Sequence, residues 1–387
     1  NRHTEGDILS NLGSAYMALG DARHAIGYYE QALAITREIG DQRAEGNAVG
    51  NLGSAYVALG DARRAIGYYE QTLAIAREIG IRGWESTALD GLGNIHADLG
   101  NTWRAIEYYE QALQITRELG NREDEGNKLN SLGTIYGKLG DTQRAINYFE
   151  QALAIAQETG DRRSEGMTLG NLGVIYSDLG NIHRAINYYE QQLVIARQIG
   201  DRIGESSDLL NLGTAYAELQ DIHRAIGYYK KALEIDRETG HRQGESNALT
   251  NLGSAYLKLD NIHDAIHYCE QALAIQQEIG DRYGEASSCW NLGLLYQKQG
   301  NLAHAMELMQ MCVNFEREAG HPDADKDAKY LAQLRSTDVN QLAFEAFQRT
   351  DSVLAMQRAV EQFPFMIKAE FIAMIKQFIE SQLSPEA

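Results

Sequence analysis

Residues 51–75 read NLGSAYVALGDARRAIGYYEQTLAI, and this stretch decides the fold because it recurs, slightly changed, about every forty residues. The leucine at its second position is followed by glycine in every copy, and an alanine column in the second half of the stretch is equally regular. Self-similarity at a fixed period of this size is the signature of a repeat architecture. The leucine column comprises Leu12, Leu52, Leu92, Leu132, Leu172, Leu212, Leu252 and Leu292.

Each repeat carries two helical patterns. Apolar residues follow Val49 at i+3, i+7 and i+10, and a second apolar series with helical spacing begins at Ile66. Gly60 and Asp61 lie between the two series. Glycine permits the left-handed conformation that ends a helix, and aspartate caps the next one. The pattern therefore predicts a hairpin of two helices in every repeat.

A single helical hairpin cannot bury its apolar stripe, whereas a stack of hairpins buries a continuous core. We therefore expect an all-α, right-handed solenoid. Gly13 and its equivalents have a packing role in this prediction, because a residue without a Cβ lets the second helix approach closely near Ala25 and Tyr29.

These residues resemble the tetratricopeptide repeat (TPR). The repeat that begins near residue 161 has the family's spaced leucine, Leu-Gly pair, tyrosine, alanine and aromatic residue, namely Leu169, Leu172-Gly173, Tyr176, Ala185 and Tyr189. The period is about forty residues where the common form has about thirty-four, and the usual proline is missing. This longer form resembles the repeats of kinesin light chains, of the LGN/Pins adaptors and of bacterial multidomain signalling proteins.

The resemblance implies a right-handed TPR superhelix. We expect eight repeats over residues 1–320, followed at 321–387 by a degenerate ninth repeat helix and a helical C-terminal cap. The cap is predicted from three short apolar segments near 339–349, 353–363 and 365–383. Because the chain begins with Asn1, partway into a repeat pattern, we also expect it to be a fragment of a longer protein.

The composition bears on partners and on location. A formal net charge of −19 argues against nucleic acid and against an anionic membrane as partners, since both require a basic face. No apolar run approaches the ~20 residues of a membrane span. Cys269, Cys289 and Cys312 occupy core positions at spacings that match no zinc motif, so we expect reduced thiols, no metal and a cytoplasmic location.

Catalytic motifs do not stand out in the sequence. We find no phosphate-binding glycine loop, no GxSxG elbow and no HExxH. The repeated glutamates at Glu5 and its equivalents suit the first turn of a helix, and Arg64 and its equivalents are expected to pair with acids of neighbouring repeats. We therefore predict no catalytic residues, no cofactor and no enzymatic activity.

An asparagine ladder is the first candidate ligand site. The resemblance implies that the first helix of each pair lines the concave wall, and that this position faces bound peptide. An amide carries a donor and an acceptor, so it can pair with a peptide backbone in both directions. The alternative is that the amides satisfy partners inside the stack. The ladder comprises Asn11, Asn51, Asn171, Asn211, Asn251 and Asn291.

The last two repeats supply the other candidates. Lys258 and Lys298 make this end more basic, and Trp290 with Leu294 makes it more apolar. An exposed tryptophan on a concave wall would anchor a ligand. The alternative is that Trp290 packs on the C-terminal cap.

The predicted function is a scaffold that binds a peptide or helical segment of a partner protein in its concave groove. The runner-up is a sensor or regulatory module of a larger bacterial enzyme, such as a STAND-type NTPase or a CHAT protease. In that case other domains of the same longer chain are partners. Self-assembly through the N-terminal end is a third, weaker possibility.

Overall fold

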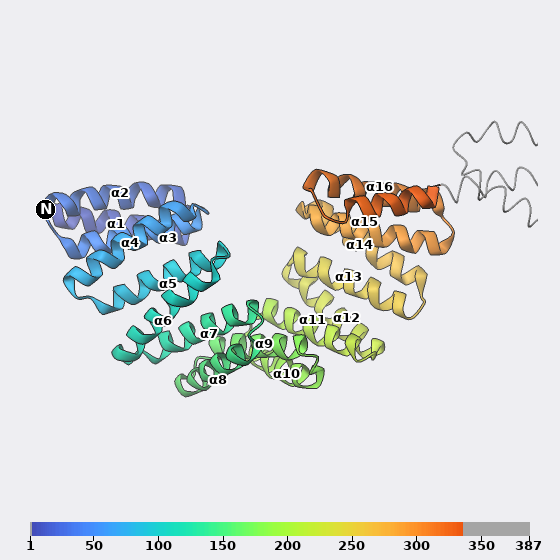
Figure 1. Cartoon of the computed structure of the whole chain (residues 1–387), viewed down its shortest axis with the longest axis horizontal. Helices are drawn as coiled ribbons and strands as arrows, with labels where there is room; N and C mark the ends of the chain where they lie inside the picture. The colour runs from blue at the N-terminus through green and yellow to red at the C-terminus, as the bar shows by residue number, and fades with distance from the viewer. Residues whose placement is uncertain (1, 336–387) are drawn as a thin grey trace, which may run out of the picture. The chain divides into compact units, whose positions relative to one another are not determined.

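The computed structural model describes residues 2–335, and the chain divides into two compact units, Asn1–Asp201 and Arg202–Ala387. The apolar segments predicted to form a cap begin at residue 339 and lie outside the described residues. The division into eight repeats and a cap therefore stays a prediction. Figure 1 shows the described part as successive antiparallel helices.

The first unit is built from five helix pairs. In each pair a helix of 17 residues is followed by one of 18. The helices are α1 (Arg2–Ala18), α2 (Ala22–Ile39), α3 (Gln42–Ala58), α4 (Ala62–Ile79), α5 (Arg82–Asp98), α6 (Thr102–Leu119), α7 (Arg122–Lys138), α8 (Thr142–Thr159), α9 (Arg162–Asp178) and α10 (Ile182–Ile199).

The described part of the second unit continues the same pattern with three pairs. They are α11 (Arg202–Glu218), α12 (Ile222–Thr239), α13 (Arg242–Lys258), α14 (Ile262–Ile279), α15 (Arg282–Gln299) and α16 (Leu302–Ala319). Residues 324–335 are also helical. No strand occurs between residues 2 and 335, so the predicted all-α fold class is confirmed.

The predicted helix ends are confirmed. The carboxylate of Asp61 accepts a hydrogen bond from the backbone N–H of Arg64 at 3.0 Å and so caps α4. Gly60 has φ +75°. The same left-handed conformation is held by Gln220 (φ +63°) and Asp260 (φ +56°), the only residues other than glycine within the described range with positive φ. A side chain with a Cβ makes that conformation costly.

The close approach predicted at the glycine column is also confirmed. A Cβ placed on Gly13 would lie 2.5 Å from Cε1 of Tyr29, and one on Gly173 would lie 2.4 Å from Cε1 of Tyr189. No real Cβ tolerates such a distance. The tyrosine of the second helix therefore lies directly on the backbone of the first.

First helices contact one another along each unit. Within the first unit α1 contacts α3, α3 contacts α5 and α7 contacts α9, and within the second unit α11 contacts α13. Fully buried leucines such as Leu132 and Leu252 fill the space beneath these helices. The first helices thus form a continuous wall in each unit, and this wall carries the candidate ligand residues.

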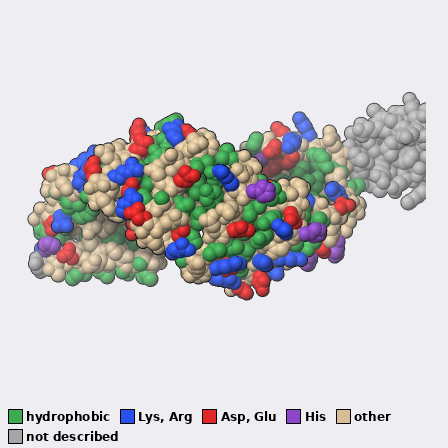
Figure 2. Space-filling model, turned by 90° about the horizontal axis from the view of Figure 1, so that it is seen from below, with side chains coloured by type: hydrophobic (Ala, Val, Ile, Leu, Met, Phe, Trp, Pro, Cys, Tyr) green, Lys and Arg blue, Asp and Glu red, His purple; other side chains and the backbone are tan. Residues whose placement is uncertain are grey.

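A repeated set of ion pairs between arginine and glutamate, which we call the ion-pair ladder, connects successive helix pairs. Glu125 in the first turn of α7 is buried, and it accepts hydrogen bonds from Arg117 of the preceding helix (2.8 Å) and Arg122 of its own helix (2.5 Å). Arg122 also reaches Glu158 at 2.6 Å. Figure 2 shows acidic and basic side chains interspersed over the face drawn there. The repeated glutamates therefore hold neighbouring pairs together.

The expectation that Arg64 and its equivalents bridge neighbouring repeats was wrong. Arg64 pairs with Asp61 of its own helix at 3.2 Å, and its guanidinium lies 5.2 Å from the ring centroid of Tyr56 in the same hairpin. Arg144 makes the corresponding contact with Asp141 at 2.5 Å. An arginine three residues after a capping aspartate reaches that carboxylate more easily than any acid of the next repeat.

Candidate functional site

The six asparagines of the ladder all lie on first helices. Asn51, Asn171, Asn211 and Asn251 are half-buried, whereas Asn11 and Asn291 are exposed.

Asn171 has a partner inside the stack. Its Nδ2 donates to Oδ1 of Asn130 on α7 at 3.1 Å. The side-chain amides of Asn211 and Asn251 make no hydrogen bond to another described residue. The two interpretations of the ladder thus apply to different members of it. One amide is held within the wall, and those of the second unit have unused donors and acceptors.

A cavity of about 400 Å³ lies over the wall of the second unit. Asn211 and Thr214 of α11, Asn251 of α13 and Ser287 of α15 line it, so three first helices contribute. Gln276, in the last turn of α14, also lines this cavity, which we call the polar cavity. Eight of its eleven lining residues carry an amide or a hydroxyl, which can donate and accept hydrogen bonds.

Gln276 gives the polar cavity an unused acceptor. Its side chain is 5% exposed, and its Oε1 has no hydrogen-bond partner. A buried acceptor without a donor costs about 1–3 kcal/mol. A ligand N–H group that reached this oxygen would remove that cost. The sequence pattern missed Gln276, although it stands where most repeats have alanine or threonine, as at Ala76 and Thr116.

The first unit has a comparable cavity of about 490 Å³. It is lined by Asn11 of α1, Asn47 and Arg43 of α3, and Trp84 of α5. Asn11 is therefore the ladder member that lines this cavity. Asn51 lies on the same wall and is absent from its lining.

The wall of the first unit also holds a charge pair that sequence reasoning missed. Lys128 of α7 is buried, and its Nζ lies 3.1 Å from the carboxylate of Asp90 on α5. The available signal was Lys128 itself, which stands in a column of small residues such as Ala48 and Ala88. The buried ammonium of Lys128 partly neutralises the negative charge of Asp90.

Trp290 and Leu294 pack against the segment that follows α16. The ring centroid of Trp290 lies 5.7 Å from that of Tyr330, and the two planes are inclined by 59°. Leu294 packs against the cluster that includes Leu331 and Leu334. Trp290 is thus half-buried, and a helix of residues 324–335 covers part of its ring.

The two candidate lysines are exposed. Lys258 lies in the last turn of α13 and Lys298 in the last turn of α15. Neither lines the polar cavity, and Asn291 does not line it either. Asn291 and Trp290 line a separate cavity of about 320 Å³ beside α16.

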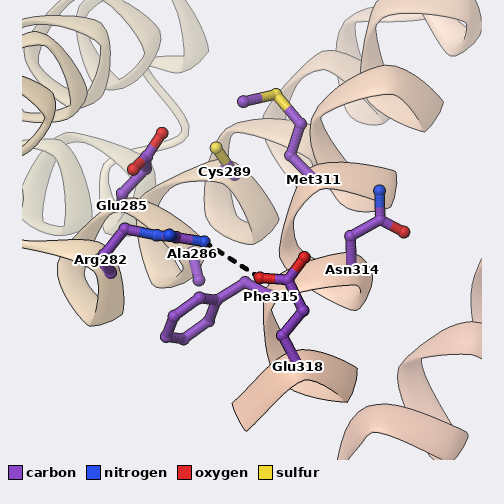
Figure 3. A pocket seen from close by; sticks show the side chains of 8 residues that line it. All are labelled: Arg282, Glu285, Ala286, Cys289, Met311, Asn314, Phe315 and Glu318. Carbon is purple, nitrogen blue, oxygen red and sulfur yellow. Dashed lines mark hydrogen bonds and ion pairs between the residues drawn. The ribbon is translucent and has the colours of Figure 1, made fainter.

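A further hollow in the second unit belongs to the ion-pair ladder (Figure 3). Its volume is about 430 Å³, and Arg282 and Glu318 pair across it at 3.4 Å. Cys289 also lines it, and burial raises the pKa of this thiol to about 11. Because a protonated thiol is a poor nucleophile and metal ligand, this hollow offers no reactive group.

Two other kinds of site are absent from the described residues. Between residues 2 and 335 no three ligating side chains lie close enough to hold a metal ion. No helix in the same range combines the length and hydrophobicity that crossing a membrane requires.

The fold is shared with several solved structures. A signal transduction ATPase with numerous domains (STAND) from Pyrococcus horikoshii, which has a tetratricopeptide repeat sensor, is 17% identical with a TM-score of 0.62, and the match covers 92% of this chain and 54% of that one. The apo quorum sensor NprR from B. thuringiensis is 13% identical with a TM-score of 0.61, over 81% and 88% of the two chains. A Rap protein complexed with Competence and Sporulation Factor is 16% identical with a TM-score of 0.53, over 86% and 98%. At these identities the likeness is one of fold.

The sequence itself matches a family model. No curated protein sequence matches the chain at a significant level. The model of the tetratricopeptide repeat matches residues 4–78, 84–158, 164–238 and 244–317. These matches cover most of the chain and follow its helix pairs. The chain therefore belongs to the tetratricopeptide repeat family and is built as a protein-interaction module.

Proposed function

We propose that the wall of the second unit binds an extended segment of a partner protein in the polar cavity. The observation that carries this proposal is the presence of two ladder asparagines, Asn211 and Asn251, on one cavity with no hydrogen bond to another described residue. Each amide can donate to a peptide carbonyl and accept from a peptide N–H. These hydrogen bonds would be made to the partner's backbone and would not depend on its side chains.

The spacing of the wall suits an extended chain. Neighbouring packed helices lie about 8–10 Å apart. A polyproline-II segment rises about 3.1 Å per residue and repeats every three residues, which is about 9 Å. The amides of Asn211 and Asn251 can therefore hold equivalent backbone groups three residues apart. Gln276, in the last turn of α14, adds one buried acceptor to the lining of the same cavity.

The net charge of the chain and the proteins of similar fold both support a peptide segment as the ligand. The net charge of −19 favours a neutral or basic partner. A Rap protein of similar fold is solved with Competence and Sporulation Factor, and NprR is a quorum sensor. These relatives support a ligand-binding role for such an array.

A second candidate is a sensor module within a larger protein. The observation that favours it is the match to the STAND protein, in which this chain would correspond to 54% of the length. Binding of a segment in the polar cavity would then report to other domains. The sequence of the full-length gene tests this, since an adjoining nucleotide-binding or protease domain is expected.

The test of the polar cavity uses two double variants. Asn211→Ala with Asn251→Ala removes both amides from the polar cavity. Asn147→Ala with Asn187→Ala removes two exposed amides from second helices and serves as the control. Peptides selected from a random library on the unaltered chain are measured by calorimetry against each.

We expect the groove variant to bind at least about tenfold more weakly, which corresponds to about 1.4 kcal/mol. Its melting temperature should match that of the control variant. Undiminished affinity, or a loss matched by a fall in melting temperature, would make the asparagines structural and overturn the proposal.

A further inference from the structure

A second cavity of the same unit combines aromatic rings with carboxylates. It has a volume of about 320 Å³ and lies between α15, α16 and the segment after Gly320. Tyr283 and Trp290 of α15 and Phe315 of α16 supply the rings. Glu316 and Asp327 supply the carboxylates. We call this the aromatic cavity.

Glu316 is the most unusual residue of the aromatic cavity. It is 8% exposed, and its Oε2 has no hydrogen-bond partner. Its Oε1 lies 3.9 Å from Nδ1 of His321. Neither Glu316 nor Asp327 pairs with a lysine or arginine among residues 2–335. Burial raises the pKa of Glu316, and the nearby carboxylate of Asp327 raises it further, while Cys312 and His321 act in the opposite direction.

The chain contains a matched acid that is satisfied. Asp236 occupies the position of Glu316 two pairs earlier and is fully buried. It accepts a hydrogen bond from Ser206 Oγ at 2.7 Å and lies 3.0 Å from Nδ1 of His241. In the last pair the histidine is kept as His321, but Ala286 replaces the serine. The last pair therefore keeps the acid and lacks the hydroxyl that would satisfy it.

The rings of the aromatic cavity are also particular to the last pair. The positions of Tyr283, Trp290 and Phe315 are held in the preceding pair by Gln243, Thr250 and Ile275. Three substitutions to aromatic residues thus coincide with an acid that has one oxygen, Oε2, without a hydrogen-bond partner. Aromatic faces attract cations, and arginine stacks on them most readily. One such contact exists within the chain, since the guanidinium of Arg282 lies 5.2 Å from the ring centroid of Phe315.

We propose that the aromatic cavity binds an arginine side chain, with the guanidinium stacked on the rings and hydrogen-bonded to Glu316. The polar and aromatic cavities share Ser287 as a lining residue. A segment lying along α15 can therefore place its backbone in one cavity and a side chain in the other. In this form the inference rests on the proposed function, because the arginine would belong to the segment bound in the polar cavity.

The first experiment tests the aromatic cavity without a peptide. Arginine amide is titrated at millimolar concentrations, and the indole N–H resonance of Trp290 is followed by NMR, with Trp290→Phe identifying that resonance. Citrulline amide has the same shape without the charge and is titrated in parallel. We expect the arginine compound to shift the resonance in a saturable way and the citrulline compound to leave it in place.

Two variants test whether the carboxylate of Glu316 itself is required for binding. Glu316→Gln keeps the shape of the side chain and should weaken arginine amide at least about tenfold. Glu318→Gln lies two residues away on the same helix, pairs with Arg282 and lines the hollow of Figure 3, so it should leave binding unchanged. Melting curves of both variants establish that the unit is folded.

The outcomes distinguish this inference from the proposed function. Binding of arginine amide that Glu316→Gln weakens and Asn211→Ala with Asn251→Ala leaves intact supports the aromatic cavity whether or not peptides bind. No shift of Trp290, an equal shift with citrulline amide, or equal affinity of the Glu316→Gln chain would overturn it. Stronger binding of lysine amide than of arginine amide would overturn the choice of a guanidinium.

Discussion

Replacing Glu125 by glutamine should loosen the junction between α6 and α7 more than the same change at Glu165 loosens the junction between α8 and α9. The two glutamates are equivalent, and both side chains are 9% exposed. They differ in one partner. Glu125 accepts from Arg117 Nε at 2.8 Å, whereas the corresponding donor to Glu165 is the neutral amide of Gln157 at 3.2 Å. The chain thus supplies its own control.

The magnitude follows from the hydrogen bonds. A bond to a charged group contributes about 1.5–3 kcal/mol net. The side chains of Arg117 and Arg122 are 49% and 44% exposed, so solvent screening lowers the contribution to about 1 kcal/mol per bond. Glutamine keeps one acceptor and turns an N–H₂ group toward the other donor. The loss at Glu125 should be about 2 kcal/mol, and that at Glu165 about 1 kcal/mol, since only Arg162 loses a charged partner there.

Hydrogen exchange measures these losses locally. In a repeat array stability is close to a sum of repeat and neighbour terms, so each change should act on its own junction. Amides of α7 should exchange about thirtyfold faster in Glu125→Gln, and those of α9 about fivefold faster in Glu165→Gln. The difference should shrink in 1 M salt, where the screening length is about 3 Å. Equal effects of the two changes, or a difference that salt leaves untouched, would refute the ladder as the tie between pairs.

Three further predictions concern the scaffold. Gln220→Gly should raise the free energy of unfolding by about 1 kcal/mol, seen as a higher urea midpoint, because Gln220 holds φ +63° where most repeats have glycine; an unchanged or lower midpoint would contradict this. Gly173→Ala should cost about 1–3 kcal/mol because its Cβ would meet Tyr189, whereas Gly227→Ala, with nothing within 4 Å, should raise the melting temperature. Burial raises the pKa of Glu85, but hydrogen bonds from its two arginines outweigh this and hold the pKa below its usual value. Its stabilising effect should thus be full above the ordinary glutamate pKa of about 4.3 and be lost as pH falls through the folded-state pKa, which urea midpoints between neutral and acid pH will check.

The repeat architecture could be predicted because each structural role occupies its own sequence column. Glycine at position 13 of the repeat, with tyrosine at position 29, predicts a close contact between the two helices. Aspartate before a helix predicts an N-terminal cap. The glycine recurs in all eight copies, and tyrosine or phenylalanine faces it in six of them, so chance agreement is excluded. The family resemblance covers the same columns, and the matched residues 4–317 agree with it.

The site could be predicted only in part, because its distinguishing residues do not recur. The asparagine column was visible, but the bond from Asn171 to Asn130 depends on a residue that appears in one repeat only. The pair of Lys128 with Asp90 depends likewise on two single substitutions. The Oε2 of Glu316 lacks the hydroxyl donor that Ser206 supplies to Asp236, because Ala286 stands in that place thirty residues earlier in the chain. Comparing the repeats column by column does not show that residues 286 and 316 are neighbours. The packing of α15 on α16 does show it.

Site-specific photo-crosslinking tests the central claim most directly, namely that partner segments bind on the wall of first helices in the second unit. A photoreactive phenylalanine analogue is placed at Asn247, which lines the polar cavity, or at Glu234, which is exposed on the second helix α12. A peptide selected on the unaltered chain is then irradiated with each. We predict crosslinking through position 247 and none through position 234. Crosslinking through 234 alone, or equally through both, would contradict the assignment of the groove.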